Sequence, residues 1–126
     1  MKTKPSLGIH YIYVAARCDN ADSEQYQRNC VEASQLGIEL VKKGYAPFVP
    51  HLAMKGWMDS GMSRKQILLL GLLWLMRCDA LFYANSSPGA DGEFKFAESL
   101  GIPVFRSMSE VPDSTFLEAW QGKVSE

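Results

Sequence analysis

The sequence has little of what marks several large classes of protein. Its 13 Lys and Arg residues nearly balance its 14 Asp and Glu residues, which leaves a net charge of −1. This charge gives no electrostatic reason to expect binding to nucleic acid or to an anionic membrane. The three cysteines, Cys18, Cys30 and Cys78, are an odd number without metal-type spacing. That usage favours reduced thiols in a cytoplasmic protein, and we expect neither a metal nor a cofactor.

Long hydrophobic runs are also scarce. The nearest to a membrane segment is ILLLGLLWLM, from Ile67 to Met76, which is about half of the ~20 residues that a membrane-spanning helix needs. The N-terminal stretch MKTKPSLG lacks the apolar region of a signal peptide. A helix that is apolar on all sides must be covered. Because the chain is small, we expect the cover to be another subunit, in a homodimer or higher homo-oligomer.

What remains is an ordinary globular composition, 47% hydrophobic and 21% charged, which suggests one domain over residues 1–126. Apolar, β-branched and aromatic runs alternate with helical patterns. Strands are predicted over residues 9–16, 45–49, 80–84 and 104–105, and helices over residues 22–43, 63–78, 94–101 and 112–121. We therefore predict an α/β fold, a three-layer flavodoxin- or Rossmann-like domain. Its four- to five-stranded parallel sheet has helices on both faces.

The stretch SPGADGE, residues 87–93, is predicted to be a Gly-rich turn between the third strand and a helix. Ligands of parallel sheets bind beyond the carboxyl ends of the strands. The Ser87 hydroxyl and the backbone at Gly89 are suited to a phosphate, although the stretch is neither a dinucleotide fingerprint nor a P-loop. Glu93 is either a first-turn carboxylate favoured by the helix dipole or a nucleophile beside a bound sugar.

Three other residues are predicted at the same edge of the sheet, each with a structural alternative. Tyr13 is either a core residue or a hydrogen-bond partner for a carboxylate. Arg17 is either a solvated loop charge or a phosphate clamp, and His51 is either a turn residue or a contact to a base. His10 and Asp79 lie at the opposite edge, so we expect both to be structural.

Several segments together resemble the nucleoside 2-deoxyribosyltransferase-like superfamily, which includes deoxynucleoside 5′-monophosphate N-glycosidases. They are IYVAA, NCVEASQLGIELVKKGYAPFVPHL, WLMRCDALF and SPGADGEFKFAESLGIPVF, spread over roughly residues 9–105. The middle and the end look closest to small uncharacterised bacterial and phage members. The resemblance also implies a dimer or larger assembly through the helix over residues 67–76.

The resemblance implies a role for each matching residue. Glu93 is the nucleophile that forms a glycosyl-enzyme intermediate, and Tyr13 orients it. Ser87 and Gly89 belong to a phosphate-binding turn, and Arg17 lies where such enzymes also contact phosphate. The implied ligand is a small nucleoside or nucleotide.

One position departs from the family pattern. Those enzymes commonly carry an aspartate one helical turn before the position of Trp74, and here that position is Gly71, with no other acid between Ser60 and Cys78. Two hypotheses follow: an N-glycosidase or 2-deoxyribosyltransferase that works through Glu93, or a nucleotide-binding sensor without turnover. A phosphoribohydrolase of the cytokinin-activating type is a weaker third, because its P-G-G-x-G-T-x-x-E loop has a second adjacent glycine and a threonine that are missing here.

Overall fold

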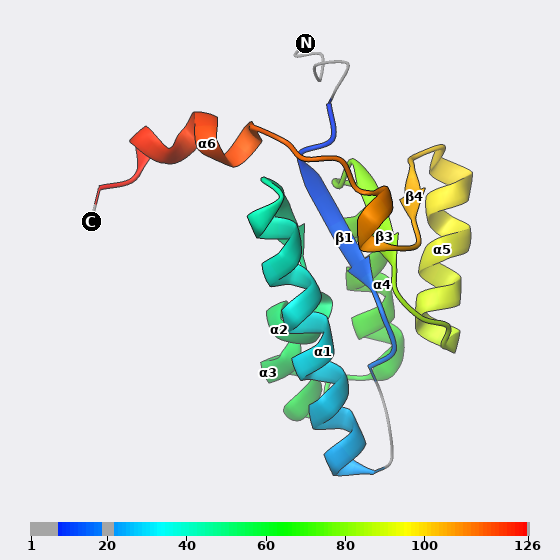
Figure 1. Ribbon diagram of the computed structural model, residues 1–126. Helices are drawn as coiled ribbons and strands as arrows, with labels where there is room; N and C mark the ends of the chain where they lie inside the picture. The colour runs from blue at the N-terminus through cyan, green and yellow to red at the C-terminus, as the bar shows by residue number, and fades with distance from the viewer. Residues whose placement is uncertain (1–7, 19–21, 126) are drawn as a thin grey trace.

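The protein is an α/β domain built on one parallel sheet of four strands. The structure, a computed structural model, describes residues 8–18 and 22–125. The strands follow the order β2-β1-β3-β4, of which Figure 1 labels β1, β3 and β4 side by side. They are β1 (Tyr11–Ala15), β2 (Ala46–Phe48), β3 (Ala80–Tyr83) and β4 (Val104–Phe105). The predicted fold class is confirmed, with four strands, and Pro47 lies on an edge strand, as a residue without an N–H donor requires.

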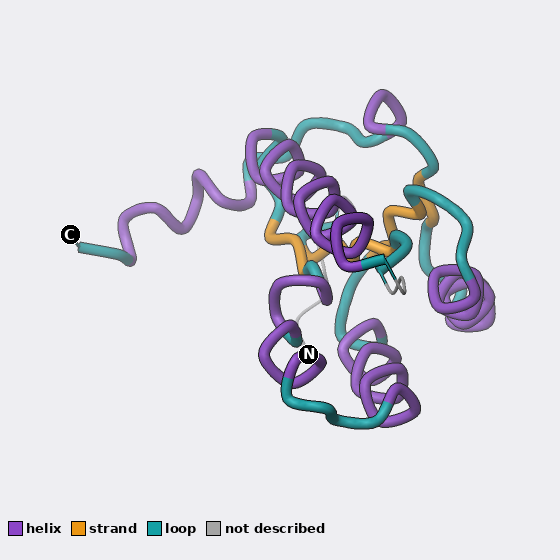
Figure 2. Tube along the Cα trace, turned by 90° about the horizontal axis from the view of Figure 1, so that it is seen from below, coloured by secondary structure: helices purple, strands orange, loops and turns teal. Residues whose placement is uncertain are grey.

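Helices cover both faces of the sheet. One face is covered by α1 (Ser23–Lys42), and the other by α4 (Arg64–Leu75) and α5 (Pro88–Leu100), as the end-on view in Figure 2 shows. Side chains alternate along each strand. Val14 and Phe82 therefore join the core under α1, whereas Tyr13 and Leu81 join the core under α4 and α5.

The helix boundaries follow local signals in the sequence. The Asp22 side chain accepts the Glu24 N–H at the start of α1, and the Ser63 hydroxyl accepts the Gln66 N–H at the start of α4, as expected for N-caps. Gly101 ends α5 with a φ of 73°, in the left-handed region that favours glycine. Asp79 accepts the N–H groups of His10 and Tyr11, in the structural role predicted for it.

The start of α5 differs from the prediction, because the stretch predicted to be a Gly-rich turn is helical. The helix begins at Pro88, and the Ser87 hydroxyl caps it by accepting the Ala90 N–H. A Ser N-cap followed by Pro at the first helical position is a strong start signal, and it outweighs the low helix propensity of the glycines. Glu93 consequently lies in the second turn, and the first-turn acid is Asp91.

Two other segments also differ from the prediction. Residues 50–62, predicted to be a loop, contain α2 (Pro50–Ala53) and α3 (Lys55–Asp59). The tail helix α6 (Phe116–Trp120) is shorter than predicted, and 3₁₀ turns lie at Met108–Glu110 and Gln121–Lys123. The residues before α6 instead dock on the end of α1, where the Ser114 N–H donates to the Lys43 carbonyl oxygen at 2.7 Å. Within the described residues, no helix has the length and apolar character needed to cross a membrane.

Candidate functional site

A tyrosine and a glutamate meet between the sheet and α5. The Tyr13 hydroxyl donates a hydrogen bond to Glu93 Oε2 at 2.5 Å. Tyr13 is fully buried in β1. Glu93 lies three residues after Ala90 and four before Ala97, both buried, so the helical period turns its carboxylate toward the sheet. The helix-dipole alternative for Glu93 therefore fails, because the side chain lies against β1 and not at the helix end.

The surroundings of Tyr13 and Glu93 raise the pKa values of both side chains. Burial raises the pKa of Glu93 to about 7, although the hydrogen bond from Tyr13 acts in the opposite direction. Burial, and then the charge of Glu93 and the hydrogen bond to it, raise the pKa of Tyr13 far above its ordinary value. The tyrosine is therefore a permanent donor. The carboxyl group, by contrast, takes and loses its proton near neutral pH.

Gly71 of α4 lies directly against this pair. A Cβ atom at position 71 would lie 2.7 Å from the Tyr13 hydroxyl oxygen and 3.4 Å from Glu93 Oε2. The first distance is too short for any real side chain, so position 71 has to be glycine while Tyr13 keeps its place. The position at which the resemblance implies an aspartate is thus beside the reactive pair, but it carries no side chain here.

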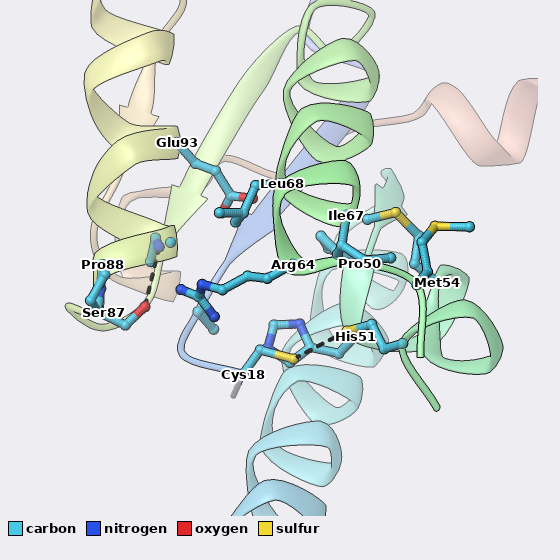
Figure 3. Close-up of a pocket in the computed structure, with 15 residues that line it drawn as sticks. Cys18, Pro50, His51, Met54, Arg64, Ile67, Leu68, Ser87, Pro88 and Glu93 are labelled. Atoms are coloured by element: carbon cyan, nitrogen blue, oxygen red, sulfur yellow. Dashed lines mark hydrogen bonds between the residues drawn. The ribbon is translucent and has the colours of Figure 1, made fainter. Parts of the chain in front are cut away.

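A cavity of about 210 Å³ opens beside Glu93 (Figure 3). Most of its wall is apolar, and three methionines spaced by four residues line it. They lie between α2 and α3, in α3, and in the segment that leads to α4. Of the predicted residues, Glu93, Ser87, Gly89 and His51 line it. The lining also contains Ala16, Cys18, Pro50, Met54, Met58, Met62, Arg64, Ile67, Leu68, Pro88 and Ala90. Tyr13 acts on the cavity through its bond to Glu93.

The neutral imidazole of His51 packs in the cavity wall. The residue is only 2% exposed, and its Nε2 lies 2.7 Å from the carbonyl oxygen of Arg17. Because a carbonyl only accepts, Nε2 carries the proton. Burial lowers the pKa of the imidazole, so the ring is neutral and Nδ1 keeps its lone pair. Among the described residues, no group donates to Nδ1.

Ser87 and Gly89 lie at the start of α5, where the cavity meets the helix end. The Ser87 hydroxyl accepts the Ala90 N–H at 3.1 Å and keeps its own proton for donation. The Gly89 N–H is one of the first-turn amides that have no acceptor within a helix. Asp91 is turned the other way, and its carboxylate accepts from Tyr83 and Ser86. The helix end therefore offers donors to the cavity.

Arg17 is not brought to this cavity. Its N–H donates to Asn85 Oδ1 at 2.7 Å, and its carbonyl oxygen is held by His51. The residue instead lines a second cavity on the α1 side of the sheet, together with Asn29 and Arg106. Arg17 therefore follows β1 at the predicted edge of the sheet but faces the other cavity, and its contact to a phosphate stays a prediction.

Sequence reasoning missed two parts of the lining. Arg64 is the first residue of α4, and a helix that runs back from the sheet begins at the same edge as the cavity, which is the signal that could have found it. The methionines Met54, Met58 and Met62 were assigned to a loop, although their spacing of four residues is the helical period. Among the described residues, no group of three or more His, Cys, Asp or Glu side chains is arranged to hold a metal ion.

Comparison with known proteins leaves the chemistry open and assigns the family. No curated protein matches the chain. A family model described as "Domain of unknown function (DUF7768)" matches residues 10–107, a span that contains all four strands, Tyr13, Glu93 and the whole lining of the cavity. Because the match covers well over half of the chain, the protein belongs to the DUF7768 family.

Proposed function

We propose that the protein cleaves the N-glycosidic bond of a nucleoside or nucleotide, with Glu93 as the nucleophile. The observation that carries the proposal is the half-buried Glu93 carboxyl group, which lines a cavity and accepts the Tyr13 hydroxyl at 2.5 Å. A carboxylate on an apolar wall is poorly solvated and is correspondingly reactive toward a developing sugar cation. Its pKa of about 7 lets the ionised form exist at neutral pH.

In this proposal the two oxygens of Glu93 have different tasks. Tyr13 holds Oε2, which leaves Oε1 to attack the anomeric carbon. The bond from C1′ to the base nitrogen breaks, its electron pair leaves with the base, and a bond from C1′ to Oε1 forms. Water or a second base then displaces the carboxylate, which gives overall retention at C1′.

Gly71 sets a limit on this chemistry. Since position 71 has no carboxyl group, the leaving base takes its proton from solvent and not from a side chain at this position. The rate should therefore depend strongly on the base itself. Nucleosides whose bases leave as weakly basic anions should react much faster than those with strongly basic leaving groups.

The test is chromatographic detection of free base from a panel of nucleosides and their 5′-monophosphates. We expect Glu93→Gln to lose at least ~10²-fold in rate, because an amide cannot form the glycosyl ester. Glu98→Gln is the matched control, since Glu98 is an exposed glutamate on the same helix. Equal rates for the wild type and Glu93→Gln would refute the mechanism.

A nucleotide sensor without turnover is the second candidate, and Gly71 is the observation that favours it. The fold, the cavity and the donors at the start of α5 are all compatible with binding alone. Calorimetric binding of a nucleotide, with no base released over hours, would select this candidate over the enzyme.

We also propose that the protein is a homodimer or higher homo-oligomer through α4. This helix exposes Leu69 (55%), Leu73 (49%), Trp74 (50%) and Met76 (54%), a concentration of apolar surface that water does not favour. Trp74→Glu should convert the assembly to monomers in size-exclusion chromatography with light scattering, whereas a monomeric wild type would refute the proposal. The free Cys18, Cys30 and Cys78 support a reducing, cytoplasmic location.

A further inference from the structure

A second cavity, of about 480 Å³, lies on the α1 side of the sheet, beyond the carboxyl ends of the strands. Its floor is apolar and includes Leu36 and Phe82, which belong to the core under α1. The lining of this cavity shares only Ala16 with the lining of the cavity beside Glu93. The two cavities therefore lie against different faces of the sheet, and a ligand of the second cavity is separate from a substrate of Glu93.

Arg106 lines this second cavity and is held there by aromatic rings. Its guanidinium carbon lies 4.8 Å from the centre of the Phe94 ring and 5.1 Å from the centre of the Tyr83 ring. The two rings are stacked on each other, and the Tyr83 hydroxyl donates to Asp91 at 2.6 Å, which fixes the ring. Contact with an aromatic face orients a guanidinium group and leaves N–H donors at its edge. Arg106 is therefore oriented in advance for an acceptor.

Arg17 and Asn85 bring further donors to the same cavity. Asn85 Oδ1 accepts the Arg17 N–H at 2.7 Å, so the NH₂ group of this amide points away from that bond. In the part of the chain that the structure describes, no carboxylate is within ion-pair distance of the Arg17 or Arg106 side chain. The described residues also supply no acceptor for the Asn85 NH₂ group. Two charged donors and one neutral donor thus face the cavity without using their protons inside the protein.

The order of the strands sets the separation of the two arginines. Arg17 follows β1 and Arg106 follows β4, with β3 between these strands (Figure 1). Neighbouring strands are ~4.8 Å apart, so the backbones that carry the two arginines are separated by roughly 10 Å. Asn85 follows β3 and lies between them. A ligand that uses all three donors therefore needs acceptors at both of its ends.

We propose that this cavity is a second binding site, for a small anion that carries two acidic groups, either phosphates or carboxylates. Arg17 and Arg106 each bind one acidic group through paired N–H donors, Asn85 donates between them, and the apolar floor packs against the rest of the ligand. Glu32 is the one acidic residue of the lining, so the two arginines outweigh it. The proposal does not depend on the proposed function, because neither Tyr13 nor Glu93 lines this cavity.

The test is isothermal titration calorimetry on the full chain, with pyrophosphate, succinate and glutarate as probes. Inorganic phosphate and acetate are the matching probes with one acidic group, and the two series distinguish a phosphate site from a carboxylate site. We expect a probe with two acidic groups to bind at least ~10-fold more tightly than its counterpart with one, because each group gains its own charge-assisted hydrogen bonds.

Variants of the lining locate the bound anion. Arg17→Met and Arg106→Met should each weaken the binding of the preferred probe at least ~10-fold. Glu32→Gln should strengthen it at least ~2-fold, because it removes a like charge. Arg77→Met is the matched control, since Arg77 is an exposed arginine after the end of α4, and Arg64→Met tests the cavity beside Glu93. Both should retain the binding.

Three results would overturn the inference. The first is equal loss of affinity in Arg77→Met and Arg106→Met, which would show a response to net charge alone. The second is loss in Arg64→Met with retention in Arg106→Met, which would place the anion beside Glu93. The third is the absence of binding by every probe. Thermal melting of each variant separates loss of binding from loss of folding.

Discussion

The raised pKa of Glu93 has a cost in folding free energy that a stability measurement can detect. Burial raises its pKa from the ordinary 4.5 to about 7. Between these two values the folded protein holds a proton that the unfolded chain releases, so the free energy of unfolding falls as pH rises. At about 1.4 kcal/mol for each pH unit, the full cost above pH 7 is about 3 kcal/mol.

Replacing Glu93 with glutamine removes this cost. The amide has the same shape and can still accept the Tyr13 hydroxyl, but it does not ionise. We expect Glu93→Gln to match the wild type near pH 4.5 and to exceed it by up to about 3 kcal/mol at pH 8. Urea unfolding at both pH values measures the difference, and Glu98→Gln controls for the loss of one charge on the same helix. A stability difference that is the same at pH 4.5 and pH 8 would refute the reasoning.

Three further predictions concern the neighbours of this carboxyl group and the edge of the sheet. Tyr13→Phe removes a bond that lowers the pKa of Glu93, so the midpoint of the pH–rate profile for base release should rise above that of the wild type; an unmoved midpoint would contradict this. Gly71→Ala should cost about 1–2 kcal/mol in thermal or urea unfolding, because the new methyl group meets the Tyr13 oxygen at 2.7 Å. The cost should be smaller in a Tyr13→Phe background, and strict additivity would count against the contact. Asp79→Ala leaves the N–H groups of His10 and Tyr11 without this acceptor and should lower the free energy of unfolding by about 2–4 kcal/mol, measured by urea denaturation.

Most of the fold was predictable because its signals are local. Apolar runs of strand length alternate with capped helical segments, and Ser63, Gly101 and Pro47 have in the structure the roles that their chemistry indicates. The start of α5 was missed because opposing local signals competed there. Two glycines suggest a turn, whereas the Ser87-Pro88 pair starts a helix, and only the folded chain shows which signal prevails.

The candidate site was only partly predictable, because the direction of a side chain depends on distant partners. The family resemblance pairs Tyr13 with Glu93, and the structure brings the two side chains together. No sequence pattern predicts the directions of the Arg17 and Arg64 side chains. The orientation of Arg17 depends on bonds to Asn85 and His51, which are 68 and 34 residues away along the chain. Nothing in the neighbouring sequence encodes those contacts.

The central position of β1 has a consequence for the order of events during synthesis. This strand pairs with β2 on one side and with β3 on the other. After β2 has left the ribosome, the edge of β1 that will pair with β3 therefore stays unpaired until β3 is synthesised. At ~5–20 residues per second, the ribosome leaves that apolar edge unpaired for a few seconds. Tyr13 and Glu93 are 80 residues apart, and the tyrosine gains its carboxylate partner only when α5 is complete. The central strand is therefore paired well before the reactive pair exists, and a nascent chain that ends before α5 has a partly built sheet without the candidate nucleophile.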